Sequence, residues 1–264
     1  MMFKILIPTD FSEISQKTIK NALTLFDASK VELMLFHAVE PLKSSTGAVK
    51  DITEHLKTAA QEFLNNECEK IATYTNAKIT TILKTGYLTS ILESVIHMYN
   101  ANLLLMSSKG ESNLYAKVFG TNAEQCLRNS SIPVLVIPTD MDIDMTAPIA
   151  ISTDDGNLYQ KEVLEKIFTA MNLKNTAILK LHIEKPKDAY LSYKEEMLMD
   201  KKVQLQILEH SNVTEALNTY LTENKTSILV TENKHHSKMD FLFNSSITKK
   251  LMAKLNAPIL SLPS

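Results

Sequence analysis

Short apolar runs alternate along the chain with segments whose apolar residues recur every three or four positions. Residues 3–8, 31–37, 103–106 and 134–137 have the length and composition of buried strands. Residues 15–29, 52–74, 91–99 and 123–127 have the apolar spacing of a helix with one buried face. Strands that alternate with helices in this way predict an α/β fold with a mostly parallel, doubly wound sheet and helices on both of its faces.

The same order of strand-like segments occurs twice. Ile5–Asp10 pairs with Ile149–Asp154, because each is an apolar run that ends in Thr-Asp. Such a repeat indicates a duplicated unit. We therefore expect two tandem domains, residues 1–140 and 147–264, each with a five-stranded sheet. Three further segment pairs keep the same order: residues 31–37 with 177–182, 103–106 with 228–231, and 132–138 with 257–263.

The linker between the two units and one segment inside the second half are both expected to be short. Residues 139–148 contain three Asp and little Gly or Ser, which indicates a short connection between packed domains. In the second half, the segment between the second and third strands (roughly Pro186 to Lys202) is shorter than its counterpart in the first half.

Composition narrows the possible functions. The net charge is −2 and Arg128 is the only Arg, so nucleic-acid recognition, which favours Arg for bidentate contacts, is not expected. Cys68 and Cys126 are too few for a disulfide framework. No apolar run approaches the ~20 residues that cross a bilayer, and no signal segment opens the chain. We therefore expect a cytoplasmic protein that makes no membrane contact.

Polar residues and glycines gather at the ends of two strands of the first half. Asp10 follows the first strand, whereas Gly110 and Gly120 follow the fourth. In an open parallel sheet, ligands bind beyond the carboxyl ends of the strands, where the strand order reverses. Glycine lets the backbone approach an anion closely, and the helix expected near Thr121 offers free N–H groups. The pattern predicts a phosphate site. The chain has only five glycines, so it is significant that two of them lie here.

The segment from Met106 to Thr121 resembles the nucleotide motif of the universal stress protein family, Gly-x2-Gly-x9-Gly-Ser/Thr. The opening Ile5–Glu13 resembles the first strand and loop of that family, and the likeness extends more faintly into the second half. It implies the strand order 3-2-1-4-5, dimeric packing and, in one subgroup, binding of ATP or AMP with or without Mg²⁺.

The resemblance assigns roles to individual residues. Asp10 would contact the ribose or the adenine, the backbone at Ala38 would contact the adenine edge, and Met106 would line the base pocket. Gly110, Gly120 and Thr121 would hold phosphates. The expected cofactor-binding residues are Pro8, Thr9, Asp10, Ala38, Met106, Ser107, Lys109, Gly110, Gly120, Thr121 and Asn122.

Two departures from the motif bear on binding. Its first glycine is Ser107 here, and a left-handed backbone at that residue would cost about 1 kcal/mol. The second half keeps Asp154, but its residues 231–246 contain no glycine. We therefore expect the second domain to bind no nucleotide and to serve as a pseudo-symmetric partner of the first.

Structural alternatives exist for the same residues. Asp10 could cap the turn into the first helix, Gly110 and Gly120 could be turn and helix-entry residues, and Lys109 could be solvated. His37 and His182 occupy equivalent strand ends, which suggests a shared structural hydrogen bond.

Neither a metal site nor a catalytic constellation is expected. His235 and His236 with Asp240 match no standard zinc spacing, and the chain has no P-loop and no nucleophile elbow. Three functions remain: a nucleotide-binding stress protein with at most slow, incidental ATP hydrolysis, a ligand-free scaffold that acts through protein contacts, and an adenylate-forming ligase or nucleotidyl transferase.

Overall fold

The computed structural model describes most of the chain, namely residues 2–41, 48–108, 121–138, 143–153, 158, 160–173, 176–184, 195–232 and 257–263. The elements of the first half are β1 (Phe3–Pro8), α1 (Glu13–Leu25), β2 (Val31–Val39), α2 (Ala48–Ala72), β3 (Lys78–Thr85), α3 (Leu88–Tyr99), β4 (Leu103–Ser107), α4 (Thr121–Asn129) and β5 (Val134–Ile137). Those of the second half are β6 (Ile149–Thr153), α5 (Lys161–Ala170), β7 (Ile178–Glu184), β8 (Glu196–Leu198), β9 (Lys201–Glu209), α6 (Val213–Glu223), β10 (Ile228–Glu232) and β11 (Ile259–Leu262).

All of these strands belong to one sheet, in the order β3-β2-β1-β4-β5-β11-β10-β6-β7-β9-β8. The first half therefore has the expected order 3-2-1-4-5, and β9-β7-β6-β10-β11 repeats that order in the second half. The expectation of two five-stranded sheets needs two additions. The halves share a continuous sheet, and the second half carries an extra edge strand, β8, antiparallel to β9.

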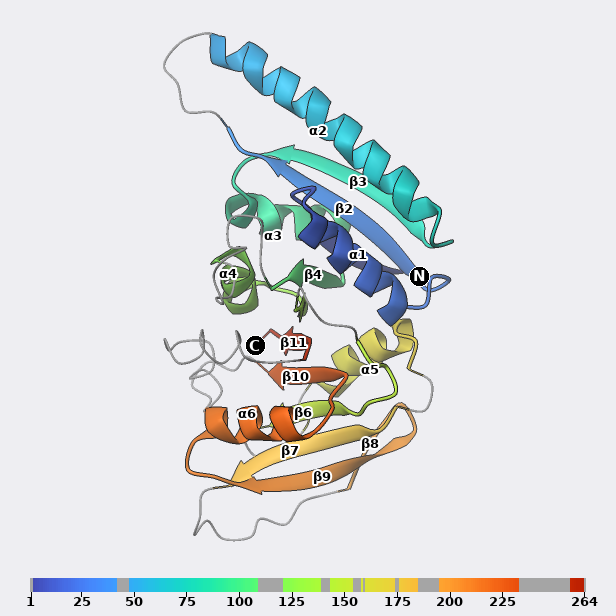
Figure 1. The fold of residues 1–264 in the computed structure, drawn as a ribbon, viewed down its shortest axis with the longest axis vertical. Coiled ribbons are helices and arrows are strands. Elements are labelled where there is room, and N and C mark those ends of the chain that lie inside the picture. The colour runs from blue at the N-terminus through green and yellow to red at the C-terminus, as the bar shows by residue number, and fades with distance from the viewer. Residues whose placement is uncertain are drawn as a thin grey trace.

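The two halves meet at one antiparallel strand pair, β5 with β11, in which Leu135 lies opposite Leu260. Figure 1 shows the halves stacked along the long axis of the molecule, with β10 and β11 near its middle. A second contact joins the ends of α1 and α5, where the Asp27 N–H donates to the Ala170 carbonyl (3.0 Å) and the Asn172 N–H to the Leu25 carbonyl (2.9 Å). Because repeat-equivalent segments contact each other in both places, the halves pair about a pseudo-twofold axis.

Helices cover both faces of the sheet, as the alternating pattern predicts. Buried residues of α1, α2 and α5 pack on one face, and those of α3, α4 and α6 pack on the other. Strands such as Val134–Ile137 are buried on both sides, which is why they read as continuous apolar runs. None of the described helices is long and apolar enough to cross a membrane.

The first helix begins and ends earlier than the apolar spacing predicts. Ser12 is its N-cap, and its hydroxyl accepts a hydrogen bond from the Ser15 N–H (3.2 Å). The helix stops at Leu25 because Asp27 turns the chain locally, since its carboxylate accepts from the backbone N–H of Ser29 (3.0 Å).

Candidate functional site

A cavity of about 800 Å³ opens beyond the carboxyl ends of β1, β2 and β4. It lies where the strand order reverses, between β1 and β4, which is the expected place for a ligand in an open α/β sheet. The cavity is lined by eight of the residues that the sequence singled out: Pro8, Thr9, Asp10, Ala38, Met106, Ser107, Thr121 and Asn122. The three others, Lys109, Gly110 and Gly120, lie outside the described residues.

Asp10 sits at the mouth of this cavity and closes the turn into α1. Its Oδ1 accepts from the backbone N–H of Ser12 (3.2 Å), from the Ser12 hydroxyl (2.5 Å) and from the hydroxyl of Ser15. Asp10 therefore makes the local hydrogen bonds that the structural alternative predicted. The same bonds fix its carboxylate at the edge of the cavity, so this role in the turn and a ligand-binding role are compatible.

Phe11 follows Asp10 in a left-handed backbone conformation, with φ of 63°. That conformation is rare for a bulky residue, and such strain persists where surrounding contacts hold it. The Phe11 N–H donates to the Thr9 hydroxyl (3.1 Å). Its ring lies against His37, with ring centres 4.4 Å apart, and near Phe63 of α2, at 5.4 Å.

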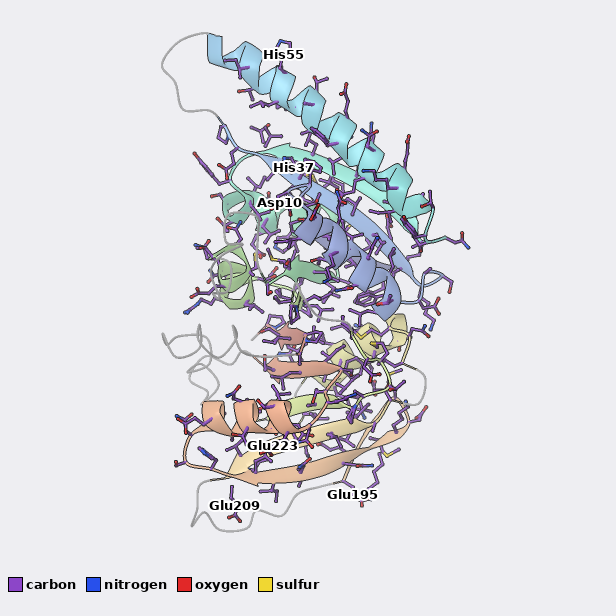
Figure 2. All side chains as sticks on the ribbon, in the orientation of Figure 1. Asp10, His37, His55, Glu195, Glu209 and Glu223 are labelled. Atoms are coloured by element: carbon purple, nitrogen blue, oxygen red, sulfur yellow. The ribbon has the colours of Figure 1, made fainter. Side chains whose placement is uncertain are left out.

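His37 holds the turn from the neighbouring strand. Its Nδ1 lies 2.8 Å from the Thr9 carbonyl oxygen, and because a carbonyl only accepts, Nδ1 carries the proton. The structural hydrogen bond expected for His37 is therefore present. Figure 2 labels His37 and Asp10 close together at this end of the first half. The same role for His182, which lies at the equivalent position of β7, stays a prediction.

Glu67 of α2 lies buried behind the turn. The Thr9 hydroxyl donates to its Oε2 (3.2 Å), whereas Oε1 is buried and has no hydrogen-bond partner among the residues described here. Burial raises the pKa of the Glu67 carboxyl, and the charge of Asp10 raises it further, against the opposing effects of Thr9 and Lys70. A carboxyl thus links α2 to the strand end that carries Asp10.

The raised pKa of Glu67 predicts a pH dependence of stability. The unfolded chain loses this proton near the ordinary value of 4.5, and the folded chain loses it at higher pH. The contribution to stability is therefore fully present below that ordinary value and is lost as the pH rises through the raised pKa. Glu67→Gln, which keeps an acceptor for Thr9, is expected to flatten this decline.

Urea unfolding between about pH 4 and pH 8 measures the effect. Glu62→Gln is the matched control, because Glu62 lies on the same helix and is exposed. If the free energy of unfolding falls with pH as steeply in Glu67→Gln as in Glu62→Gln, Glu67 is not the source of the pH dependence.

Ser107 takes the place of the first glycine of the motif without backbone strain. It ends β4 in extended conformation, paired with Ile137 of β5. The described non-glycine residues with positive φ are Phe11, Asn100, Met199 and Asp200, so Ser107 is not among them. The cost that a left-handed Ser107 would bring therefore does not arise.

The helix expected after the motif begins at Thr121. Thr121 and Asn122 are exposed in its first turn, and they line the cavity beside the buried Ala123. The free N–H groups of a helix start favour an anion. Glu124 in the same turn pairs with Arg128 (2.9 Å), which offsets its charge.

One side of the cavity was missed by the sequence analysis. Leu56, Ala59, Ala60 and Phe63 of α2 line it. Two of these side chains are largely exposed, Leu56 at 41% and Phe63 at 56%. Exposed apolar residues at helical spacing were a signal in the sequence, but they read equally well as part of a helix–sheet core.

Candidate metal ligands do not converge in the part of the chain that the structure describes, where no three His, Cys, Asp or Glu side chains cluster. His235, His236 and Asp240 lie outside that part, as does Asp154, the second-half counterpart of Asp10.

Known proteins resemble the first half of the chain in sequence. Residues 1–138 match the sequence model of the universal stress protein family. Universal stress protein MJ0531 of Methanocaldococcus jannaschii is 29% identical over 138 residues, which are 51% of this chain and 81% of that protein. Universal stress protein MJ0577 of the same organism is 25% identical in an alignment of 154 residues, which covers 52% of this chain and 95% of that protein.

The likeness of fold also includes the second half. The crystal structure of a universal stress protein from Archaeoglobus fulgidus DSM 4304 covers 98% of this chain and 96% of its own, with a TM-score of 0.68. Its sequence identity is 16%, so this match shows a shared fold alone.

Proposed function

Since the chain belongs to the universal stress protein family, we propose that the cavity of its first half binds an adenine nucleotide, ATP or AMP. One observation carries the proposal. The residues that the motif singled out from distant parts of the sequence converge on one cavity at the point where the strand order reverses. Nucleotide occupancy would act in a stress response by changing how the chain packs or which partner it contacts.

The chemistry of the cavity wall suits the two ends of such a ligand. Ala38 and Met106 contribute to the apolar core on the α3 and α4 face and offer an apolar surface for a base. Thr121 and Asn122 open α4, where N–H groups and hydroxyls suit phosphate oxygens. Asp10, fixed by three hydrogen bonds, suits the hydroxyls of a ribose.

We propose different roles for the two halves. The first domain, residues 1–140, binds the nucleotide, and the second, residues 147–264, binds none and completes an intramolecular pseudo-dimer. The internal pairing of β5 with β11 supports this arrangement. We further propose that the chain catalyses at most slow, incidental ATP hydrolysis. We also propose that two chains form a homodimer and that the protein is cytoplasmic.

Thermal unfolding with ATP or AMP tests the function. A ligand that binds only the folded state at a hundred times its dissociation constant stabilises by about 2.7 kcal/mol, so millimolar nucleotide is expected to raise the melting temperature. Asp10→Ala is expected to reduce that rise.

Asp27→Ala is the matched control. Asp27 also accepts from a backbone N–H and a hydroxyl, both of Ser29, but does not line the cavity. Native protein with no rise at millimolar ATP or AMP would favour the ligand-free scaffold instead. If nucleotide raises the melting temperature of Asp10→Ala and Asp27→Ala equally, Asp10 does not contact the nucleotide.

A further inference from the structure

The side of the cavity formed by α2 exposes apolar surface that the proposed nucleotide contacts do not use. Leu56 and Phe63 lie seven residues apart on one helix, so both side chains fall on the same face, and both line the cavity. They are 41% and 56% exposed. Apolar side chains that gather at a concave surface mark a place where a ligand covers them.

Aromatic rings continue this surface into the cavity. The ring of Phe11 lies near both His37 and Phe63, with its centre 4.4 Å from the first ring and 5.4 Å from the second. We call His37, Phe11 and Phe63 the aromatic wall. Centre separations of this size are typical of stacked or tilted ring pairs.

The chain holds the aromatic wall in place at the cost of backbone strain. Phe11 has φ of 63°, and its N–H bonds the hydroxyl of Thr9, which in turn donates to buried Glu67. His37 bonds the carbonyl of the same Thr9. A bulky residue kept in a left-handed conformation by contacts with Thr9, His37 of β2 and Phe63 of α2 is typical of a functional site.

Charge separates this wall from the phosphate end of the cavity. Asp10 immediately precedes Phe11, and Glu40 follows the strand that carries His37; both line the cavity. Their carboxylates would repel a phosphate beside the wall, whereas an uncharged ring brings no such repulsion. The first turn of α4 belongs to another part of the cavity lining and favours the anion.

We infer that the aromatic wall is a stacking subsite for a planar heteroaromatic ring, with Phe63 as the open face on which the ring rests. The inference rests on the proposed nucleotide site and deepens it, because it adds Phe63 of α2 to the apolar surface that Ala38 and Met106 offer the base and leaves the phosphates at α4. Stacking on an aromatic face tolerates different bases, so the subsite would accept adenine without excluding other flat heterocycles.

A single tryptophan can report this contact, because the chain has none. Phe63→Trp keeps an aromatic ring at an exposed position and makes it fluorescent. Ile52→Trp is the matched control, since Ile52 is 47% exposed on the same helix but is not among the residues that line the cavity. ATP and adenosine are expected to quench Phe63→Trp and to leave Ile52→Trp unchanged, and tripolyphosphate, which has no ring, is expected to quench neither.

Binding of ATP to alanine variants provides the second measurement. Phe63→Ala is expected to weaken ATP binding about tenfold and to leave tripolyphosphate binding unchanged, whereas Ile52→Ala is expected to change neither. If ATP raises the melting temperature of Phe63→Trp without quenching it, the base lies elsewhere and the stacking subsite is wrong, although the nucleotide site stands. If ATP stabilises neither this variant nor the native protein, the nucleotide site fails and the subsite fails with it.

Discussion

Leu135→Ala is expected to lower the free energy of unfolding by about 3 kcal/mol. Leu135 is fully buried in β5, opposite Leu260 of β11, in the one strand pair that joins the two halves of the sheet. Directly opposite residues of an antiparallel pair have their Cβ atoms about 5 Å apart, and both leucines belong to the core under α1, α2 and α5. Removing the Leu135 side chain would leave a cavity between the two halves, and neither half could fill it without breaking the strand pair. Urea unfolding followed by circular dichroism measures the loss.

The pseudo-twofold axis makes this prediction more specific. Leu260 is the repeat-equivalent of Leu135, so Leu260→Ala is expected to cost a similar amount, and the double variant to cost less than the sum because the two side chains share one contact. Leu205→Ala on β9, where the side chain is only half-buried, should cost about 1 kcal/mol. Additive losses, or a loss at Leu135 no larger than at Leu205, would argue against the joined sheet.

The first half could be predicted from its sequence to a large extent, because its elements are strongly periodic. The apolar run at residues 3–8 is β1 without change, and the run at residues 134–137 is β5. The repeat predicted the second set of strands, and the family resemblance supplied the strand order. Eight of the predicted site residues line one cavity because parallel strands end at a common edge, which their positions along the sequence already imply.

The rest depended on contacts that periodicity does not encode. The β8–β9 hairpin turns at Met199 and Asp200, both left-handed with φ of 52° and 57°, and Met-Asp is not the Asn-Gly pair that announces such a turn. The pairing of β5 with β11 could not be predicted, because the sequence does not show that the edge strands of the two halves pair with each other. The aromatic wall depends on the left-handed backbone of Phe11, which nothing in a Thr-Asp-Phe-Ser sequence requires.

The hairpin also changes what the second half buries. In the first half, Leu35 of β2 is fully buried in the core on the α1 and α2 face. Its repeat-equivalent on β7 is Lys180, which is only 2% exposed. In the second half, the described residues between the second and third strands include β8, and Glu196 of β8 supplies the ion pair that Lys180 requires. An apolar core position of the first half is therefore ionic in the second half, where β8 supplies the counter-charge.

Glu196→Gln is expected to lower the free energy of unfolding by about 3 kcal/mol, because it leaves the buried ammonium of Lys180 without its counter-charge. The Glu196 side chain is itself 23% exposed, which keeps the loss at the lower end of the range for buried pairs. Glutamine still offers Oε1 to the backbone N–H of Leu158, a bond of 3.2 Å in Glu196. Its amide NH2 takes the place of Oε2, so the variant removes both the counter-charge and the hydrogen-bond acceptor of Lys180. Urea unfolding at neutral pH measures the change.

Glu195→Gln is the control one residue away, because Glu195 pairs with Lys202 at the surface, with side chains 79% and 61% exposed. It should change stability by less than about 0.5 kcal/mol. Figure 2 labels Glu195 at the outer edge of the second half. Adding Lys180→Met to Glu196→Gln removes the unpaired charge and fills the same core position, and should recover most of the loss. A double variant as unstable as Glu196→Gln alone would mean that the loss comes from the hairpin itself and not from a stranded charge.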